Sequence, residues 1–283
     1  MHETQQETKK LRNAKIITVT SGKGGVGKSN VSINIAIELS RLHKKVIILD
    51  ADFGLANVEI MLGIRPKYSL ADLMFRGKSL TEIITEGPEN IGFISGGSGI
   101  EELANMNSFQ VQYLSHKLYE LDELADYIII DTGAGISDAL MHFIKSSDQT
   151  LLVATPEPTS ITDAYAVLKI LNRATAESEC KPIVHMVSNR VTTYEEGKQL
   201  YEKLNVVVRK FLQVTLEYQG AVLQDTNILR AVMEQKPISI AFPKSPAAQS
   251  FVELAHMIAG GERMEQTKKG GIRQLFSNLI STR

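Results

Sequence analysis

Ser21-Gly22-Lys23-Gly24-Gly25-Val26-Gly27-Lys28-Ser29 is the stretch that decides the fold of this 283-residue chain. It contains the pattern Gly-x-x-x-x-Gly-Lys-Ser, whose glycines let backbone N–H groups turn towards phosphate oxygens. Lys28 can reach the β- and γ-phosphates of a nucleotide, and the Ser29 hydroxyl can ligate Mg²⁺. An apolar strand is predicted before the loop, over 16–20, and a helix after it, over 31–42, whose positive end would face the phosphates. We therefore predict a phosphate-binding loop rather than a chance glycine-rich turn.

Composition limits the classes of protein to consider. The chain is 43% hydrophobic and 22% charged, as in ordinary globular proteins, and its formal net charge is −1. No overall basic field points to nucleic acid, so no direct nucleic-acid partner is expected. The single cysteine, Cys180, excludes an internal disulfide and a C-x-x-C metal or cluster site, and it fits a reducing cytoplasm. Residues 1–12 lack the apolar centre of a signal peptide, and no apolar run in the sequence approaches the length of a membrane span.

The strand pattern predicts an α/β fold. Several candidate strands are apolar at successive positions, as in 46–49 and 128–130, which indicates strands covered on both faces in a mostly parallel sheet. The predicted strands are Lys15–Thr20, Lys45–Leu49, Ile91–Ser95, Tyr127–Ile130, Thr150–Ala154, Ile183–Ser188, Phe211–Leu216 and Ile238–Ala241. The predicted helices are 28–43, 110–124, 137–147, 160–177, 193–204, 228–235 and 246–259. We predict a three-layer P-loop NTPase with a mostly parallel central sheet.

The domain boundaries follow from this pattern. Residues 1–13 form a polar N-terminal leader, and residues 14–260 form the P-loop domain. Residues 261–269 are polar and read as a linker. Residues 270–283 are predicted to form a C-terminal amphipathic helix.

Aspartates follow two of the predicted strands at the edge where open α/β sheets bind ligands. Asp131 comes directly after Ile128–Ile130 and is expected to be the Walker B carboxylate near Mg²⁺, although aspartate is also common in strand-terminal turns. Asp50 and Asp52 follow 46–49, and their spacing points them the same way on an extended segment. The predicted magnesium site comprises Ser29, Asp52 and Asp131.

Ser188-Asn189-Arg190 follows another predicted strand. An asparagine side chain can form two hydrogen bonds with an adenine edge. The guanine-reading pattern Asn-Lys-x-Asp is absent from 189–192, so adenine is favoured over guanine. An ordinary loop asparagine is the alternative.

The loop, with its additional Lys23, resembles the deviant Walker A loop of the MinD/ParA ATPases. In that family the additional lysine reaches across a nucleotide-sandwiched homodimer to the partner's phosphates. A solvated surface lysine is the alternative. The resemblance extends to Asp50-Ala51-Asp52-Phe53-Gly54-Leu55-Ala56-Asn57, which is similar to the family's switch I, and to Asp131-Thr132-Gly133-Ala134-Gly135, which is similar to switch II.

This resemblance implies a slow, switch-type ATPase that uses ATP/ADP and Mg²⁺. The implied catalytic residues are Lys23, Lys28 and Asp52, of which Asp52 orients the attacking water, while Asp50 supports phosphate and dimer contacts. The implied nucleotide-binding residues are Gly22, Lys23, Gly24, Gly25, Val26, Gly27, Lys28, Ser29, Asn30, Asp50, Asn189, Arg190, Pro237 and Ile238.

The C-terminal segment carries a separate pattern. Its apolar residues recur at i, i+3, i+4, i+7 and i+8 and form one stripe on a helix. These residues are Ile272, Leu275, Phe276, Leu279 and Ile280. Lys268, Lys269 and Arg273 add positive charge, and a helix about 16 Å long is too short to span a bilayer. The stripe suits an anionic membrane surface or, alternatively, the protein's own core. The membrane-targeting tail of the family favours the membrane, where a dimer gains avidity.

Thr155-Pro156-Glu157-Pro158-Thr159-Ser160-Ile161-Thr162-Asp163-Ala164-Tyr165 resembles the FlhG branch of this family, also called FleN or YlxH. That branch regulates flagellar number, placement and assembly, which implies an FlhF-type GTPase and basal-body or C-ring proteins as partners. It also implies a cytoplasmic protein held reversibly at the inner face of the cell membrane. Of the branch's N-terminal GTPase-stimulating element, residues 6–12 retain only the Leu-Arg end.

Other functions remain open. Division-site placement of the MinD type is one, and a nucleotide-gated scaffold with negligible turnover is another. A DNA segregator is disfavoured because no basic cluster is evident in the sequence outside the tail. An iron–sulfur carrier is disfavoured by the lone Cys180, and a tyrosine autokinase by the lack of any tyrosine after Tyr218.

Overall fold

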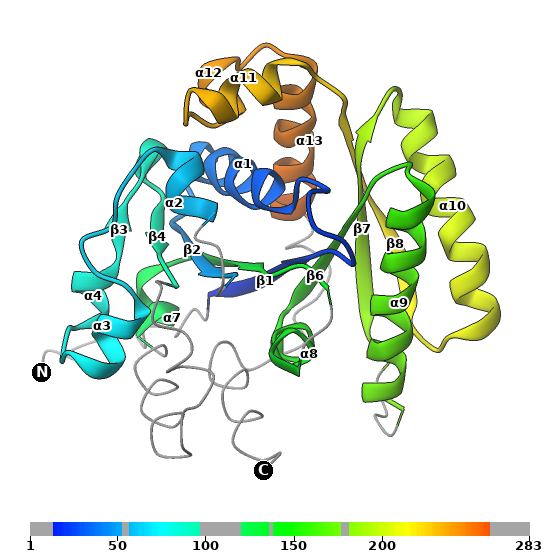
Figure 1. The fold of residues 1–283 in the computed structure, drawn as a ribbon, viewed down its shortest axis with the longest axis horizontal. Helices are drawn as coiled ribbons and strands as arrows, with labels where there is room; N and C mark the ends of the chain where they lie inside the picture. The colour runs from blue at the N-terminus through cyan, green and yellow to red at the C-terminus, as the bar shows by residue number, and fades with distance from the viewer. Residues whose placement is uncertain (1–13, 53–56, 97–119, 136–137, 177–180, 261–283) are drawn as a thin grey trace, which may run out of the picture.

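An eight-stranded sheet with the order β3-β4-β2-β5-β1-β6-β7-β8 runs through the molecule (Figure 1). The computed structural model describes residues 14–52, 57–96, 120–135, 138–176 and 181–260. The strands are β1 (Lys15–Thr20), β2 (Val46–Ala51), β3 (Thr85–Glu86), β4 (Gly92–Ile94), β5 (Tyr127–Thr132), β6 (Gln149–Ala154), β7 (Ile183–Val191) and β8 (Thr215–Leu223). Neighbouring strands are parallel except at β3, which pairs antiparallel with β4. The predicted α/β class with a mostly parallel sheet is confirmed.

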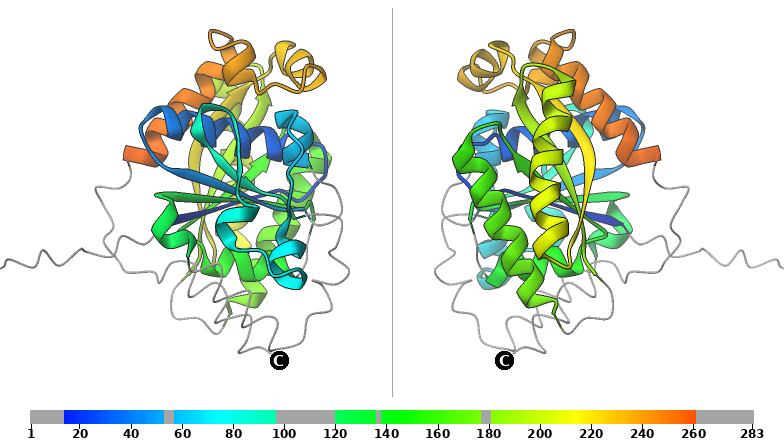
Figure 2. Two further views of the ribbon diagram at one scale, coloured as in Figure 1. Left: turned by 90° about the vertical axis from the view of Figure 1, so that its left-hand side faces the viewer. Right: turned by 90° about the vertical axis from the view of Figure 1, so that its right-hand side faces the viewer.

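Helices cover both faces of the sheet and complete three layers, as the two side views show (Figure 2). The longer helices are α1 (Lys28–Arg41), α8 (Asp138–Ser146), α9 (Pro158–Ala174), α10 (Tyr194–Phe211) and α13 (Pro246–Gly260). The shorter ones are α2 (Asn57–Leu62), α3 (Leu70–Phe75), α4 (Leu80–Ile83), η1 (Pro88–Asn90), α7 (Leu121–Leu124), α11 (Asn227–Met233) and α12 (Ile238–Ala241).

Successive apolar residues of the central strands pack into different hydrophobic cores, one on each face of the sheet. Ile16 and Ile128 pack with α3, α4 and α7, whereas Ile17 and Ile129 pack with α1 and α13. All four side chains are fully buried. A third core joins α8, α9 and α10 on β6, β7 and β8. A strand buried on both faces needs apolar residues at every position, which explains the continuous runs in the sequence.

One predicted strand is wrong, and the start of another is misplaced. Residues 238–241 form α12, which follows Pro237 and in which the Ser239 N–H donates to Asn34 Oδ1 at 3.0 Å. The strand predicted over 211–216 begins only at Thr215, because α10 continues to Phe211. Leu200, Leu204 and Val208 are buried at four-residue spacing, which keeps this segment helical.

Short helices between β2 and β3 were not predicted. α3 and α4 are too short to show a periodic apolar pattern, and each begins instead with a capping box. Ser69 pairs with Asp72 in one box, and Ser79 pairs with Glu82 in the other. Of the helix predicted over 110–124, only α7 lies within the described residues.

Several predictions for the chain ends lie outside the described residues. These are the leader 1–13, the linker 261–269 and the helix 270–283 with its apolar stripe. Within the described part of the chain, no helix combines the length and hydropathy needed to cross a membrane.

The sheet brings the acidic strand ends together. β5 lies between β1 and β2, so its last residues have neighbours on both sides. Asp131 pairs in register with Asp50 on β2 and with Val19 on β1. The phosphate-binding loop leaves β1 at this same edge and leads into α1.

Candidate nucleotide-binding site

Glycines shape the loop between β1 and α1. Gly25 and Gly27 have φ angles of 78° and 91°, a left-handed region that strongly favours glycine. Gly22 is needed for a different reason: a Cβ added there would lie 2.2 Å from the backbone carbonyl of Asp163 on α9. The loop therefore lies directly against the first turns of α9.

The start of α1 offers an anion site. Gly27 caps this helix without a side-chain hydrogen bond, and its first turn holds no acidic residue. The first N–H groups of a helix have no partner within the helix and carry its positive dipole end. Lys28, Ser29 and Asn30 occupy this turn, as a phosphate-binding loop requires.

A buried ion pair marks the centre of the site. Lys28 Nζ lies 3.2 Å from Asp131 Oδ1, and their side chains are 7% and 0% exposed. The Ser32 hydroxyl donates to the same oxygen at 2.8 Å. Ser32 was not predicted as a site residue, although it lies four residues after Lys28 and so on the same face of α1.

The second carboxylate oxygen of Asp131 indicates whether the site suits a bound cation. Asp131 Oδ2 and Thr20 Oγ1 are buried and have no hydrogen-bond partner among the described residues. Unpaired buried oxygens are costly, so a carboxylate oxygen left free beside Lys28 fits a hydrated Mg²⁺. Among the described residues, no group of three or more His, Cys, Asp or Glu side chains could hold a metal ion by itself. Magnesium is usually held by one or two carboxylates together with waters and substrate phosphates.

Asp50 and Asp52 have different environments. Asp50 is 1% exposed and accepts the N–H groups of Asp52 at 3.1 Å and Val58 at 3.2 Å. Burial and the nearby Asp131 raise the pKa of Asp50 to about 7. Asp52 is half-buried and accepts the amide of Asn57 at 3.0 Å. Asp50 thus fixes the backbone around the start of α2, while Asp52 lies where solvent can reach it.

Lys23 is held by the start of α9. Its Nζ donates to Glu157 Oε2 at 2.8 Å and to Thr159 Oγ1 at 3.0 Å. This hydrogen bond and the charge of Lys23 lower the pKa of Glu157. Both side chains of the ion pair are partly exposed, at 38% and 51%. The sequence analysis assigned neither contact, because each joins residues more than 130 positions apart.

Of the residues predicted to read adenine, Asn189 contacts the loop directly. Asn189 is 3% exposed, donates to the Val26 carbonyl at 2.7 Å and accepts the Arg190 N–H at 2.9 Å. Arg190 is exposed and has a φ of 58°. Pro237 and Ile238 are buried at the start of α12. Asn189 therefore braces the phosphate-binding loop.

Comparison with known proteins now adds to this geometry. The family model described as ParA, NUBPL iron-transfer P-loop NTPase, matches residues 12–259. The chain belongs to the ParA family of P-loop NTPases. This assignment agrees with the loop, the buried lysine–aspartate pair and the parallel sheet described above.

Two named relatives share most of the chain. The antiactivator FleN of Pseudomonas aeruginosa is 37% identical over 88% of this chain and 87% of its own. The flagellum site-determining protein YlxH of Helicobacter pylori is 34% identical over 95% of this chain and 90% of its own. Among solved structures, the cell division ATPase MinD of Pyrococcus furiosus is 25% identical, with a TM-score of 0.69 over 87% of this chain and 99% of that one.

Proposed function

We propose that this chain is a Mg²⁺-dependent ATPase whose slow turnover serves as a switch. The observation that carries the proposal is the buried pair of Lys28 and Asp131 beside an unpaired carboxylate oxygen, at the start of α1. Ser29 and Asp131, with Asp52 nearby, are the residues that would hold Mg²⁺, which when bound neutralises charge on the β- and γ-phosphates.

The protein groups then act by position. The N–H groups of the loop and the first turn of α1 hold the phosphates, and Lys28 offsets the charge that develops on them. Asp52 is only half-buried, so it can orient the attacking water. No covalent intermediate is required, because positioning and charge neutralisation carry this reaction.

Hydrolysis is proposed to depend on a homodimer. The Lys23 side chain is 38% exposed, so its amine can leave Glu157 and enter the phosphate site of a second copy. The site would then be complete only when two chains enclose two nucleotides. Adenine would be read by Asn189 and Arg190, with Pro237 and Ile238 alongside.

The biological role proposed is regulation of flagellar number, placement and assembly. Its support is the identity to FleN and YlxH over most of the chain. An FlhF-type GTPase and flagellar basal-body or C-ring proteins are the proposed partners. Residues 270–283 would hold the dimer reversibly at the inner face of the membrane through their apolar stripe.

A combined assay of hydrolysis and assembly tests this function. Asp52→Ala should abolish ATP hydrolysis while leaving a dimer that stays on anionic vesicles in the presence of ATP. A scaffold with negligible turnover would show the same dimer lifetime with and without the substitution. Absence of any ATP-dependent dimer in the unmodified chain, measured by sedimentation, would contradict the proposal.

Division-site placement is the second candidate, supported by the shared fold with MinD of Pyrococcus furiosus. Deletion of the gene in its own organism separates the two roles. Altered flagellation with normal septa supports the flagellar role, whereas misplaced septa with normal flagella supports the division role.

A further inference from the structure

Helix α10 carries a second apolar stripe that the fold does not use. Its inner stripe, with Leu200, Leu204 and Val208, is buried against β7 and β8. On its outer side Val206 is 67% exposed, Val207 is 39% exposed and Phe211 is 62% exposed. The inner stripe is sufficient to attach the helix, so the outer one calls for another explanation.

Local sequence preference makes the outer stripe more unusual. Valine loses χ1 freedom in a helix and ranks below lysine, glutamate or alanine as a helix former. An exposed helix surface built for stability alone would carry those residues instead. Grouped apolar side chains on a surface mark contact with another molecule more often than scattered ones do.

Cations lie within and beside this stripe. Lys203, Val206, Val207, Lys210 and Phe211 follow the spacing i, i+3, i+4, i+7 and i+8, and we call them the α10 outer face. Lys210 Nζ lies 5.2 Å from the centre of the Phe211 ring. From Lys203 to the end of the helix, α10 contains no acidic residue and also carries Arg209.

The neighbouring helix extends the positive charge. The C-terminal ends of α9 and α10 lie side by side in both ribbon views (Figures 1 and 2), and the Gln213 N–H donates to Asn172 Oδ1 at 2.6 Å. Lys169 and Arg173 are exposed on α9 near this contact. Glu177 and Glu179, which follow in the sequence, lie outside the described residues.

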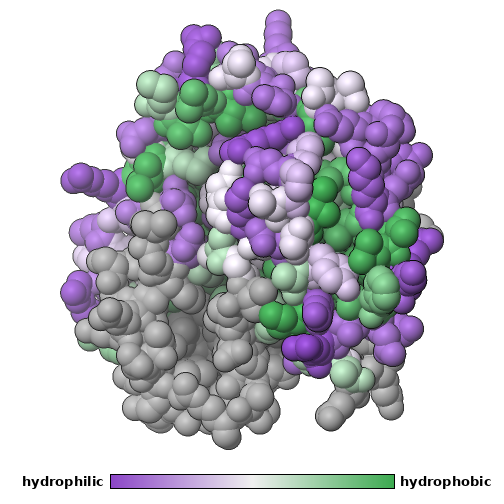
Figure 3. Space-filling model, turned by 45° about the vertical axis from the view of Figure 1, so that its right-hand side comes forward, coloured by the Kyte–Doolittle hydropathy of each residue, from purple (hydrophilic) through white to green (hydrophobic). Residues whose placement is uncertain are grey.

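We propose that the α10 outer face rests on an anionic lipid surface. Short apolar side chains and one aromatic ring suit the shallow boundary between headgroups and acyl chains. The lysine stems can cover apolar surface while their ammonium groups reach lipid phosphates. In the space-filling view, purple and green surfaces alternate on the right-hand side, where α9 and α10 lie (Figure 3). The cations on and beside this face favour a surface that carries many negative charges, as an anionic membrane does.

This inference rests on the proposed membrane association and adds a second contact to it. Residues 270–283 would provide one attachment, and the α10 outer face would fix how the domain lies on the membrane. The two attachments can fail independently, so the test changes them separately in the full chain.

Vesicle flotation measures the contact. The full chain is mixed with vesicles of phosphatidylcholine containing 30% phosphatidylserine, and in parallel with phosphatidylcholine alone. Lys203→Glu with Lys210→Glu should weaken partition to the anionic vesicles at least about 25-fold, since each cation near such a surface contributes about fivefold. Phe211→Glu should weaken it by about tenfold or more, and 0.5 M salt should weaken the unmodified chain.

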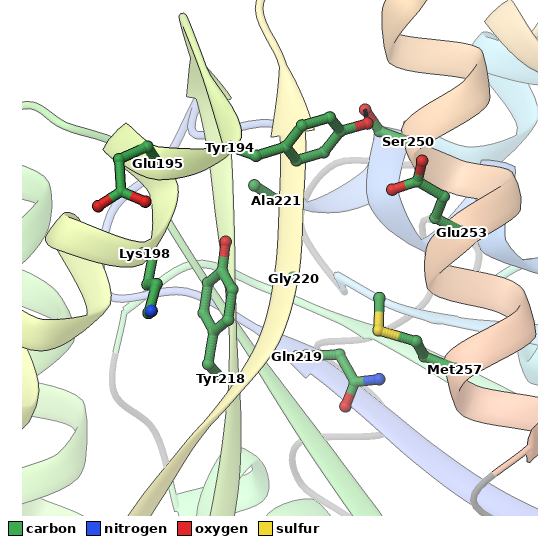
Figure 4. A pocket seen from close by; sticks show the side chains of 10 residues that line it. All are labelled: Tyr194, Glu195, Lys198, Tyr218, Gln219, Gly220, Ala221, Ser250, Glu253 and Met257. Carbon is green, nitrogen blue, oxygen red and sulfur yellow. Dashed lines mark hydrogen bonds between the residues drawn. The ribbon is translucent and has the colours of Figure 1, made fainter.

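Lys198→Glu is the control on the same helix, and its charge change equals that of each single substitution, Lys203→Glu or Lys210→Glu. Lys198 lines a cavity of about 340 Å³ between α10, β8 and α13, beside Tyr218 and across the cavity from Glu253 (Figure 4). This variant should partition much more strongly than the double variant. Circular dichroism melts confirm that all variants fold, which the exposure of the substituted side chains favours.

Phe276→Glu separates this inference from the tail. If only this variant loses binding and the α10 variants behave like Lys198→Glu, the inference is overturned while the tail proposal stands. If the α10 variants lose binding and Phe276→Glu does not, the α10 contact stands and the tail proposal fails. Loss of DNA-duplex binding or of self-association in the α10 variants, with vesicle binding unchanged, would assign the face to that other partner and overturn the lipid contact.

Discussion

Gly22→Ala tests whether the phosphate-binding loop is fitted against α9. The added Cβ would lie 2.2 Å from the Asp163 carbonyl carbon and oxygen and 2.7 Å from the Ala164 nitrogen. Ordinary carbon contacts lie at about 3.5–4.0 Å, so the loop or the start of α9 must move by about 1 Å. These are backbone atoms, which cannot relax by changing a rotamer. Overpacking of this kind typically costs about 1–3 kcal/mol.

Thermal unfolding of the nucleotide-free protein measures this cost. For a chain of this size each kcal/mol lowers the melting midpoint by about 2–4 °C, so Gly22→Ala should melt about 2–12 °C below the unmodified protein. Gly24→Ala is the matched control, because its added Cβ would meet only Ala134 Cβ, at 3.9 Å. Equal midpoints for Gly22→Ala and Gly24→Ala would refute the close packing of loop and helix. Titration calorimetry should also show weaker ATP binding by Gly22→Ala, because the displaced loop no longer aims its N–H groups at phosphate.

Three further outcomes follow from the site. Burial and Asp131 raise the pKa of Asp50 to about 7, so between about pH 4 and 7 the folded chain keeps a proton that the unfolded chain releases. The free energy of unfolding, measured in chelator without nucleotide, should therefore fall as pH rises through this window, and Asp50→Asn should flatten the slope; a slope unchanged in the variant would contradict the assigned pKa. Lys23→Ala should retain ATP binding but lose ATP-dependent dimers and hydrolysis, and a dimer of the variant in analytical ultracentrifugation would remove the proposed role across the dimer. Asn189→Ala should cost about 1–3 kcal/mol in urea unfolding, because the Val26 carbonyl loses its 2.7 Å hydrogen bond; a variant as stable as the unmodified chain would show that Asn189 does not brace the loop.

Local patterns were sufficient to predict the centre of the fold. The bounds of β1 match the predicted strand. The unbroken apolar runs of β2 and β5 led to the correct prediction of a mostly parallel sheet. The segment 238–241 misled because a short apolar run fits a buried helical turn as well as a strand. The helix predicted to end at residue 204 continues to Phe211, because the buried spacing of Leu204 and Val208 holds this segment against the sheet.

The candidate site shows the same limit. The loop motif identified Lys28, and the end of a predicted strand identified Asp131. The structure places the two side chains together. Ser32 was missed because a serine within a helix does not by itself indicate a functional site. The carboxylate that it contacts, Asp131, comes from β5 and is distant in the sequence. The partners of Lys23 were missed because they come from another element of the fold, and no local pattern encodes that pairing.

The hydrogen bond from Asn189 to Val26 connects the phosphate-binding loop to β7, a strand of nine residues. β7 runs from this bond back to Ile183 and packs beneath α10. A displacement of α10 would therefore be transmitted along β7 to the phosphate-binding loop. Attachment of the domain to a fixed support could therefore alter the timing of its chemical cycle without any movement of the central strands. If a membrane holds α10, as proposed above, the place of attachment would influence the nucleotide cycle through this strand.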